Sequence, residues 1–344
     1  MRIITIIIFV RKILLFLFTL IFYQSFCFAE INEVNIYSAR QEILMRELIN
    51  NFEKKEKIKV NIIFSKANQL IKKLEMEGKY TKADILLTVD VARLLKAKNN
   101  GLFKRIDSEI LQKQIPSIYR DKDNHWFGLS LRARVFVYHE ERVSEKELGG
   151  YLSLMDSNWK SRLLVRSSNN VYNQSLISAM IHNYGREKTK EFLINFTKNF
   201  ARSPSGGDRD QIRAVVAGEG DLALVNSYYF LKMKKDDKKG YLKKIKFYLP
   251  YDDTMKTHIN ISGAGIIKYS KNTKNAVRFL EYLISDEAQK IYAEKNLEYP
   301  IKDNLIITDF LKGYNIAKKD DLNLNLIADN NKKALIMMGE AGWQ

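Results

Sequence analysis

Three strand-like segments near the start of the chain are each followed by a helical segment. The strand-like segments are EVNIYSA (33–39), KVNIIFS (59–65) and ADILLTVD (83–90). The segments with apolar residues at helical spacing cover about 42–54, 67–78 and 91–101. Gly78 and Gly101 provide the stop signals of the second and third helices. A repeated strand–helix order is typical of a parallel sheet covered by helices, so we predict an α/β fold.

Two later stretches predict long strands that cross between two lobes. Residues 125–141, HWFGLSLRARVFVYHEE, are rich in β-forming residues and include an alternating pattern. Residues 257–270, THINISGAGIIKYS, provide a return strand. A chain of this length with 46% apolar residues can bury two lobes. We therefore expect a first lobe formed by 30–135 and 264–344, and a second lobe formed by 136–263.

The first 29 residues are predicted to be a signal peptide. Basic residues precede an apolar run at 13–23, which ends in QSFCFAE. The small residues Cys27 and Ala29 form a cleavage-like pattern, so we expect cleavage after Ala29 and export to the periplasm. An uncleaved membrane anchor is the alternative, because the apolar residues 3–10 lengthen the hydrophobic stretch.

The net charge would be +14 after this cleavage. The signal segment carries three of the 57 basic residues, which leaves 54 against 40 acidic ones. Such an excess suits nucleic acid or an anionic surface. The lysines are nevertheless spread along the chain, and acidic residues interrupt the densest run at 234–246. We expect no nucleic-acid partner, and we keep a membrane-anchored, basic interaction protein as an alternative.

Residue patterns that would indicate an enzyme are missing from the sequence. Cys27 is the only cysteine, so the mature chain would have no disulfide, no zinc–thiolate site and no cysteine nucleophile. The four histidines form neither an i,i+4 pair nor an H-E-x-x-H motif. No G-x-S-x-G nucleophile elbow occurs. We therefore predict a binding protein rather than an enzyme.

An adjacent tyrosine pair follows a predicted buried strand. The strand in DLALVNS (221–227) breaks at its Asn-Ser, and Tyr228 and Tyr229 come next. Tyr172 likewise lies between the end of a strand and a helix predicted from about residue 174. Open α/β sheets bind ligands beyond the carboxyl ends of their strands, and phenolates suit hard cations such as Fe(III). These tyrosines are candidate ferric-iron ligands, and ordinary packing tyrosines are the alternative.

Arginines provide candidate anion sites. Arg40 stands at the predicted start of a helix, where the dipole favours an anion, and its guanidinium would hold a carbonate or carboxylate beside iron. An ordinary exposed arginine is the alternative. Arg132 and Arg134 alternate on a strand, so they share one face, which is either part of a cleft or solvated. Asp208 is expected to cap the helix that follows it.

At these residues the chain resembles the periplasmic ferric-ion-binding proteins of ABC-type iron importers. From residue 33 to 301 its motifs follow the order of that family: YSARQ, ADILLTVDVARL, WFGLSLRARVFVY, VYNQSL, RSPSGGDRDQI, DLALVNSYY and HINISGAG. The resemblance implies a two-lobed, type II periplasmic-binding fold that holds Fe(III) in the interlobe cleft and delivers it to an ABC permease. It also implies that Tyr172, Tyr228 and Tyr229 are the tyrosine ligands from the second lobe.

The chain departs from many family members in the first lobe. Their segment often reads R-H-Y, whereas this one reads Arg40-Gln41-Glu42. It is similar to a subgroup in which three tyrosines bind iron and carbonate fills the remaining positions. That resemblance implies that Arg40 and Gln41 hold carbonate or bicarbonate, and it leaves Glu42 as an extra ligand or a helix-start residue. We expect a monomer, and the alternative ligands for this fold are a phosphonate, a polyamine or a thiamine-like molecule.

Overall fold

The computed structural model describes residues 32–302 and 308–344. The predicted signal peptide and its cleavage site lie outside the described residues. The described residues from Val34 onward form one compact unit. Within the two described ranges, no helix combines the length and the apolar content that a membrane span requires.

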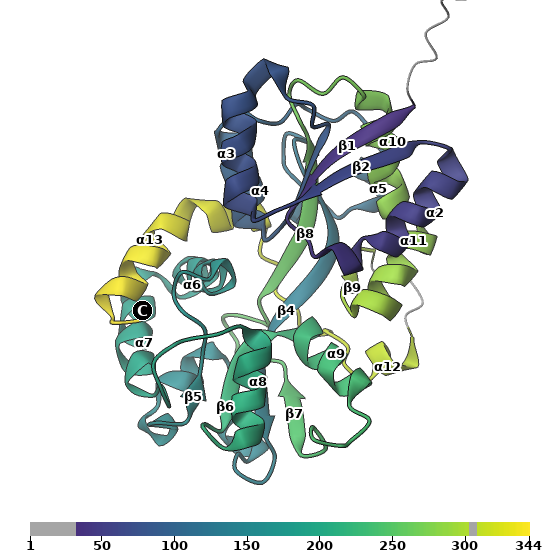
Figure 1. Cartoon of the computed structure of the whole chain (residues 1–344). Helices are drawn as coiled ribbons and strands as arrows, with labels where there is room; N and C mark the ends of the chain where they lie inside the picture. Colours follow the sequence, from purple (N-terminus) through teal and green to yellow (C-terminus); the bar gives the residue numbers. More distant parts are fainter. Residues whose placement is uncertain (1–31, 303–307) are drawn as a thin grey trace, which may run out of the picture. The chain divides into compact units, whose positions relative to one another are not determined.

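The strands of this unit form one mixed sheet (Figure 1). They are β1 (Glu33–Ser38), β2 (Lys59–Phe64), β3 (Ile85–Val89), β4 (Phe127–His139), β5 (Leu163–Leu164), β6 (Leu222–Asn226), β7 (Ile245–Tyr248), β8 (Ile259–Ile266) and β9 (Tyr299–Pro300). Their order is β2-β1-β3-β8-β4-β6-β5, and β7 and β9 also pair with β4. β1 and β3 are parallel, as the strand–helix repeat predicts, whereas β8 runs antiparallel to both β3 and β4.

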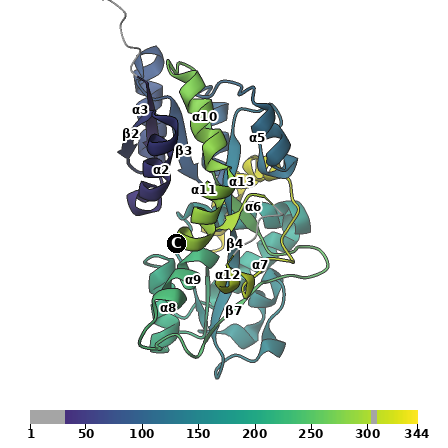
Figure 2. The ribbon, with the colours of Figure 1, turned by 90° about the vertical axis from the view of Figure 1, so that its right-hand side faces the viewer.

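Strand β4 belongs to two parts of the sheet. It pairs with β8 from Phe127 to Ala133, and it pairs with β6 from Arg134 to Tyr138. We call β1, β2, β3, β8 and β9 the first half-sheet, and β5, β6 and β7 the second half-sheet. Figures 1 and 2 show β4 running through both. β4 and β8 are the two long strands that the sequence predicts for residues 125–141 and 257–270.

The helices flank this sheet. They are α2 (Arg46–Glu56), α3 (Ala67–Glu77), α4 (Val91–Asn99), α5 (Glu109–Gln114), α6 (Val171–Tyr184), α7 (Arg186–Lys198), α8 (Asp208–Ala217), α9 (Ser227–Asp236), α10 (Thr273–Leu283), α11 (Asp286–Ile291), α12 (Asp309–Lys312) and α13 (Ile327–Glu340). Gly78 has a φ of 50° after α3 and Gly101 a φ of 67° just beyond α4, so the predicted stops use backbone conformations that glycine favours.

Two helix starts differ from the prediction. Residues 42–54 do not form one helix, because a 3₁₀ turn, η1 (Glu42–Leu44), precedes α2, and the buried Met45 separates them with a φ of −108°. Helix α6 begins at Val171 rather than near residue 174. Its start is fixed by Asn170, whose side chain accepts a hydrogen bond from the backbone N–H of Tyr172 at 3.1 Å. Tyr172 therefore belongs to the first turn of a helix.

The C-terminal helix α13 packs against α6 and α7 and also contacts α4 (Figure 1). Trp343 fixes the end of the chain, since its ring contacts that of Phe196 at 5.3 Å and its Nε1 donates to the carbonyl of Arg166 at 2.8 Å. This end of the chain thus contacts helices from both predicted lobes. The predicted lobe boundaries stay a prediction.

Candidate metal centre

The three candidate tyrosines lie in the first turns of two helices. Tyr172 is the second residue of α6, and Tyr228 and Tyr229 are the second and third residues of α9. Helix α9 follows β6 directly, so the carboxyl end of a buried strand delivers the tyrosine pair. Helix N-termini carry partial positive charge, which favours negatively charged groups such as phenolates near them.

The structure brings these tyrosines together, two of them beneath one guanidinium. The rings of Tyr228 and Tyr229 have centroids 4.1 Å apart, at 33° to one another. The guanidinium of Arg132 lies over two rings, 5.6 Å from that of Tyr172 and 5.7 Å from that of Tyr228. Tyr172 also interacts electrostatically with both members of the pair. Phenols that are distant in sequence thus share one small region.

Burial keeps the adjacent tyrosine pair protonated in the metal-free protein. It raises the pKa of Tyr228 well above the usual value of 10, and the neighbouring phenols Tyr172 and Tyr229 raise it further, while Arg132 opposes the shift. Burial, Tyr172 and Asp208 raise the pKa of Tyr229 to about 12. A phenol binds a metal ion as its anion, so a cation that binds here must displace these protons.

Asp208 is a buried carboxylate that binds two arginines, and it is not the helix cap that the sequence predicts. Its carboxylate accepts hydrogen bonds from Nη1 of Arg134 and Nη1 of Arg166, each at 2.8 Å. The capping bond of α8 comes instead from Asp210, which accepts from the backbone N–H of Gly207 at 2.8 Å. The prediction for Asp208 was wrong because the first residue of α8 faces the buried Arg134 and the half-buried Arg166.

Arg40 is buried and linked to Arg132 through a serine. Both guanidinium groups donate a hydrogen bond to Oγ of Ser262 on β8. Arg40 also forms an ion pair with Glu298, whose Oε1 lies 2.8 Å from Nη2. Burial alone would raise the pKa of Glu298, but the charges of Arg40 and Arg132 outweigh burial and lower this pKa. No sequence motif had identified Glu298.

The other two first-lobe candidates lie at the surface. Gln41 and Glu42 are exposed, at the start of η1. The carboxylate of Glu42 forms an exposed ion pair with Nη2 of Arg46 at 3.0 Å. The structure does not join Glu42 to the tyrosines by a contact, so the roles of both residues stay predictions.

A second buried carboxylate that the sequence did not reveal is Asp90. Its side chain accepts hydrogen bonds from Oγ of Ser175 at 2.7 Å and from Nδ2 of Asn260 at 2.8 Å. Ser175 lies on α6, one turn after Tyr172, so Asp90 fixes the helix that carries this tyrosine. A capping role was visible in the sequence, because Asp90 precedes α4 and accepts from the N–H of Ala92. The hydrogen bond between Asp90 and Ser175 on α6 was not visible in the sequence.

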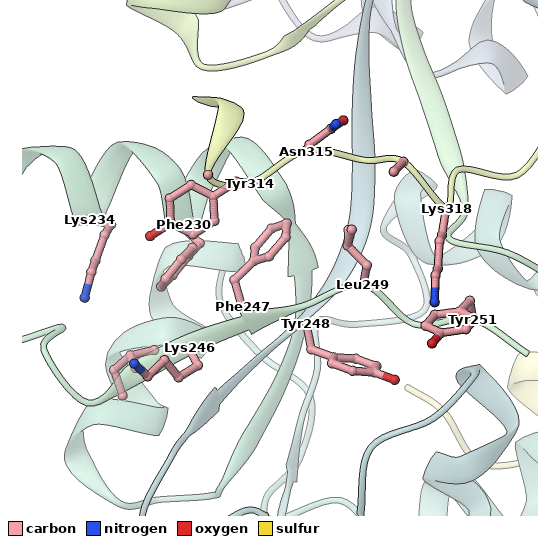
Figure 3. Close-up of a pocket in the computed structure, with 13 residues that line it drawn as sticks. Phe230, Lys234, Lys246, Phe247, Tyr248, Leu249, Tyr251, Tyr314, Asn315 and Lys318 are labelled. Carbon is pink, nitrogen blue, oxygen red and sulfur yellow. The ribbon is translucent and has the colours of Figure 1, made fainter. Parts of the chain in front are cut away.

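A separate pocket of about 490 Å³ lies beside α9 and β7 (Figure 3). Its lining includes the aromatic residues Phe230, Phe247 and Tyr314, together with Lys234 and Lys318. None of the three candidate tyrosines lines this pocket. It is therefore distinct from the tyrosine cluster.

Another group with metal-binding side chains, Asp121, Asp123 and His125, already surrounds a cation. The ammonium group of Lys98 lies 2.7 Å from an Asp121 oxygen and 2.8 Å from an Asp123 oxygen. A lysine of the chain itself, Lys98, thus supplies the positive charge that balances these carboxylates.

The fold defines the class as a type II periplasmic-binding protein. The structure superimposes with a TM-score of 0.86 on the Trichodesmium protein IdiA (FutA) in complex with iron and citrate, at 39% identity over 91% of this chain and 100% of that one. The ferric iron-binding protein A of Mannheimia haemolytica, in an open conformation, gives a TM-score of 0.84 at 43% identity, over 91% and 99%. These neighbours confirm the predicted α/β fold.

A family model for bacterial extracellular solute-binding proteins matches residues 80–320, and the chain belongs to this family. Iron uptake protein A1 of Synechocystis is 38% identical to this chain over 92% of it and 88% of the relative. The predicted resemblance to ferric-ion-binding proteins is therefore confirmed. The relatives are uptake and binding proteins, which agrees with the prediction that the chain is not an enzyme.

Proposed function

We propose that this protein is exported to the periplasm, binds Fe(III) there through the phenolate oxygens of Tyr172, Tyr228 and Tyr229, and delivers the ion to an ABC permease. One observation carries the proposal: three tyrosines from two helix starts, buried or half-buried, lie close together, with one guanidinium over the rings of Tyr172 and Tyr228 and Tyr229 against Tyr228. Three phenolates would balance the charge of Fe(III). The names of an iron uptake protein and of a ferric iron-binding protein among the similar proteins support the same cargo.

The proposed site includes an oxyanion of the carbonate type. Phenolates from three residues leave coordination positions of Fe(III) to other ligands, and Arg40 and Arg132 supply positive charge nearby. Gln41 would assist Arg40, and Glu42 would act as an accessory group. The related Trichodesmium complex contains citrate together with iron, which supports an oxygen-rich anion as the companion of the metal.

The metal content and colour of protein purified from the periplasm test this function. Iron-loaded protein should contain one Fe(III) per chain and show a visible phenolate-to-iron charge-transfer band. The same preparation should be titrated with a phosphonate, a polyamine and thiamine as competing ligand classes. Colourless protein that takes up no Fe(III) but binds one of these molecules would replace iron as the cargo. N-terminal sequencing of the same material tests cleavage after Ala29.

A further inference from the structure

Both terminal nitrogens of Arg40 are occupied by one internal carboxylate. Nη2 donates to Oε1 of Glu298 at 2.8 Å, and Nη1 donates to Oε2 at 3.1 Å. Arginine uses the same two-point geometry to bind a free carboxylate or carbonate. The two residues are 258 positions apart and are 3% and 2% exposed, so this is a buried ion pair rather than a surface contact.

Buried serine hydroxyls from two paired strands surround the ion pair of Arg40 and Glu298. Ser130 on β4 donates a hydrogen bond to Oε2 of Glu298, and Ser262 on β8 accepts one from Nη1 of Arg40. Ser130 and Ser262 are direct partners in the β4–β8 register, so the two strands hold both ends of the ion pair. Among the described residues, Nε of Arg40 is buried without a hydrogen-bond partner. One donor of this guanidinium is thus left for another acceptor.

We propose that Glu298 is an internal counter-anion of Arg40 and that it sets the affinity of the iron site for the accompanying oxyanion. The inference rests on the proposed function, in which Arg40 holds that anion. A free oxyanion must share Arg40 with Glu298 or displace it. Because Glu298 acts through Arg40, it is a positioning residue rather than an iron ligand.

Removing the charge of Glu298 should therefore strengthen anion binding. In the Glu298→Gln variant, Arg40 remains as a buried charge without its partner, a situation that strongly destabilises proteins. An oxyanion that accepts hydrogen bonds from the vacated donors neutralises the charge of Arg40 again. Because such an anion binds the folded state and not the unfolded state, it raises the stability of the variant. The native protein, in which the pair is neutral, should gain much less from the same anion.

Thermal unfolding of the iron-free protein tests this inference with bicarbonate as the probe. Native protein and Glu298→Gln are compared in bicarbonate and in chloride at equal ionic strength, so that general screening cancels. We expect the variant to have the lower Tm in chloride and to recover with bicarbonate. Its dissociation constant for bicarbonate should be at least about tenfold lower than that of the native protein. After iron loading, the charge-transfer band of the variant should change at a correspondingly lower bicarbonate concentration than that of the native protein.

Two further variants control the experiment. Glu77→Gln removes the charge of a carboxylate that pairs with Lys73 at 2.7 Å and does not touch Arg40, so it should show no recovery with bicarbonate. Glu298→Asp, with its shorter side chain, should bind bicarbonate with intermediate strength, and it replaces the Gln variant if that one does not fold.

Bicarbonate binding no tighter in these Glu298 variants than in the native protein would overturn the inference. Because this readout uses iron-free protein, it is independent of the iron result. Absence of a phenolate band in native, iron-loaded protein would instead overturn the proposed function.

Discussion

The phenol oxygen of Tyr172 lies 3.5 Å from Nη1 of Arg132, although the residues are 40 positions apart. The same guanidinium lies over the ring of Tyr228. Burial alone would lower the pKa of Arg132, but interactions with Tyr172, Glu298 and Tyr228 outweigh it and raise this pKa. Arg132 therefore stays charged and opposes the rise in the pKa of Tyr228.

Replacing Arg132 by Gln should weaken iron binding at neutral pH. Without the cation, loss of the phenol protons costs more, so the pH profile of iron affinity should move to higher pH. A shift of one pKa unit corresponds to about tenfold in affinity. Arg105→Gln makes the same charge change at an exposed position and should leave the profile unchanged. An unmoved profile in a folded Arg132→Gln protein would contradict the proposed coupling.

Replacing a proposed ligand by phenylalanine should have a larger effect. Tyr228→Phe removes one oxygen and retains the ring, so the helix should stay packed while iron affinity falls at least about a hundredfold, above the loss typical of outer-shell changes. The charge-transfer band should weaken or shift in parallel. Tyr241→Phe, at an exposed tyrosine, is the matched control. Equal iron affinity and colour in both variants would remove Tyr228 from the ligand set.

Iron binding should release protons. Burial raises the pKa of Tyr228 well above 10 and that of Tyr229 to about 12, so both phenols hold protons at neutral pH and must lose them to bind Fe(III). Affinity should therefore fall as the pH is lowered. Calorimetric titration in buffers of different ionisation enthalpy counts the released protons, and a count of zero would exclude phenolate ligation.

The same shifts predict alkaline instability of the iron-free protein. The folded-state pKa values are raised, so their contribution to stability is complete below the unfolded value of about 10 and is lost as the pH rises through the folded values. Unfolding by denaturant at pH 9 and pH 11 measures this loss. A Tyr228→Phe, Tyr229→Phe protein should lose less stability over the same interval.

His258 should make the protein sensitive to acid. Complete burial, together with the charge of Arg134, lowers the pKa of His258 from 6.5 to about 3. A depressed folded-state pKa contributes stability above pH 6.5, and this contribution is lost as the pH falls toward 3. The loss should reach about 1.4 kcal/mol per pH unit in that window.

Replacing His258 by Leu should remove this part of the acid sensitivity, as measured by urea unfolding at pH 7.5 and pH 5. His182→Leu changes an exposed histidine and should leave the pH dependence intact. Identical acid sensitivity in the native protein and His258→Leu would show that other groups govern it.

Local sequence patterns predicted the strands and the neighbourhood of the tyrosines. The apolar run before Asn226 marked a buried strand, and the rule that ligands bind beyond strand ends led directly to Tyr228 and Tyr229. The first-turn position of Tyr172 was missed by a few residues, because the capping side chain of Asn170 starts α6 earlier than its apolar pattern does.

The buried carboxylates behind the site were out of reach of such patterns. Glu298 meets Arg40 across 258 positions, Asp208 meets Arg134 across 74, and Asp90 meets Ser175 across 85. The local sequence around each acid does not point to its distant partner, which only tertiary packing selects. Charge pairing in the interior therefore had to be read from the structure.

The change of partner along β4 has a mechanical consequence. Ala133 is the last residue that pairs with β8, and Arg134 is the first that pairs with β6, so Arg132 and Arg134 stand on either side of the junction. Any flexing of the strand at this junction would swing two cations relative to the phenols. Bending of the strand would thereby change the electrostatic potential at the phenol oxygens.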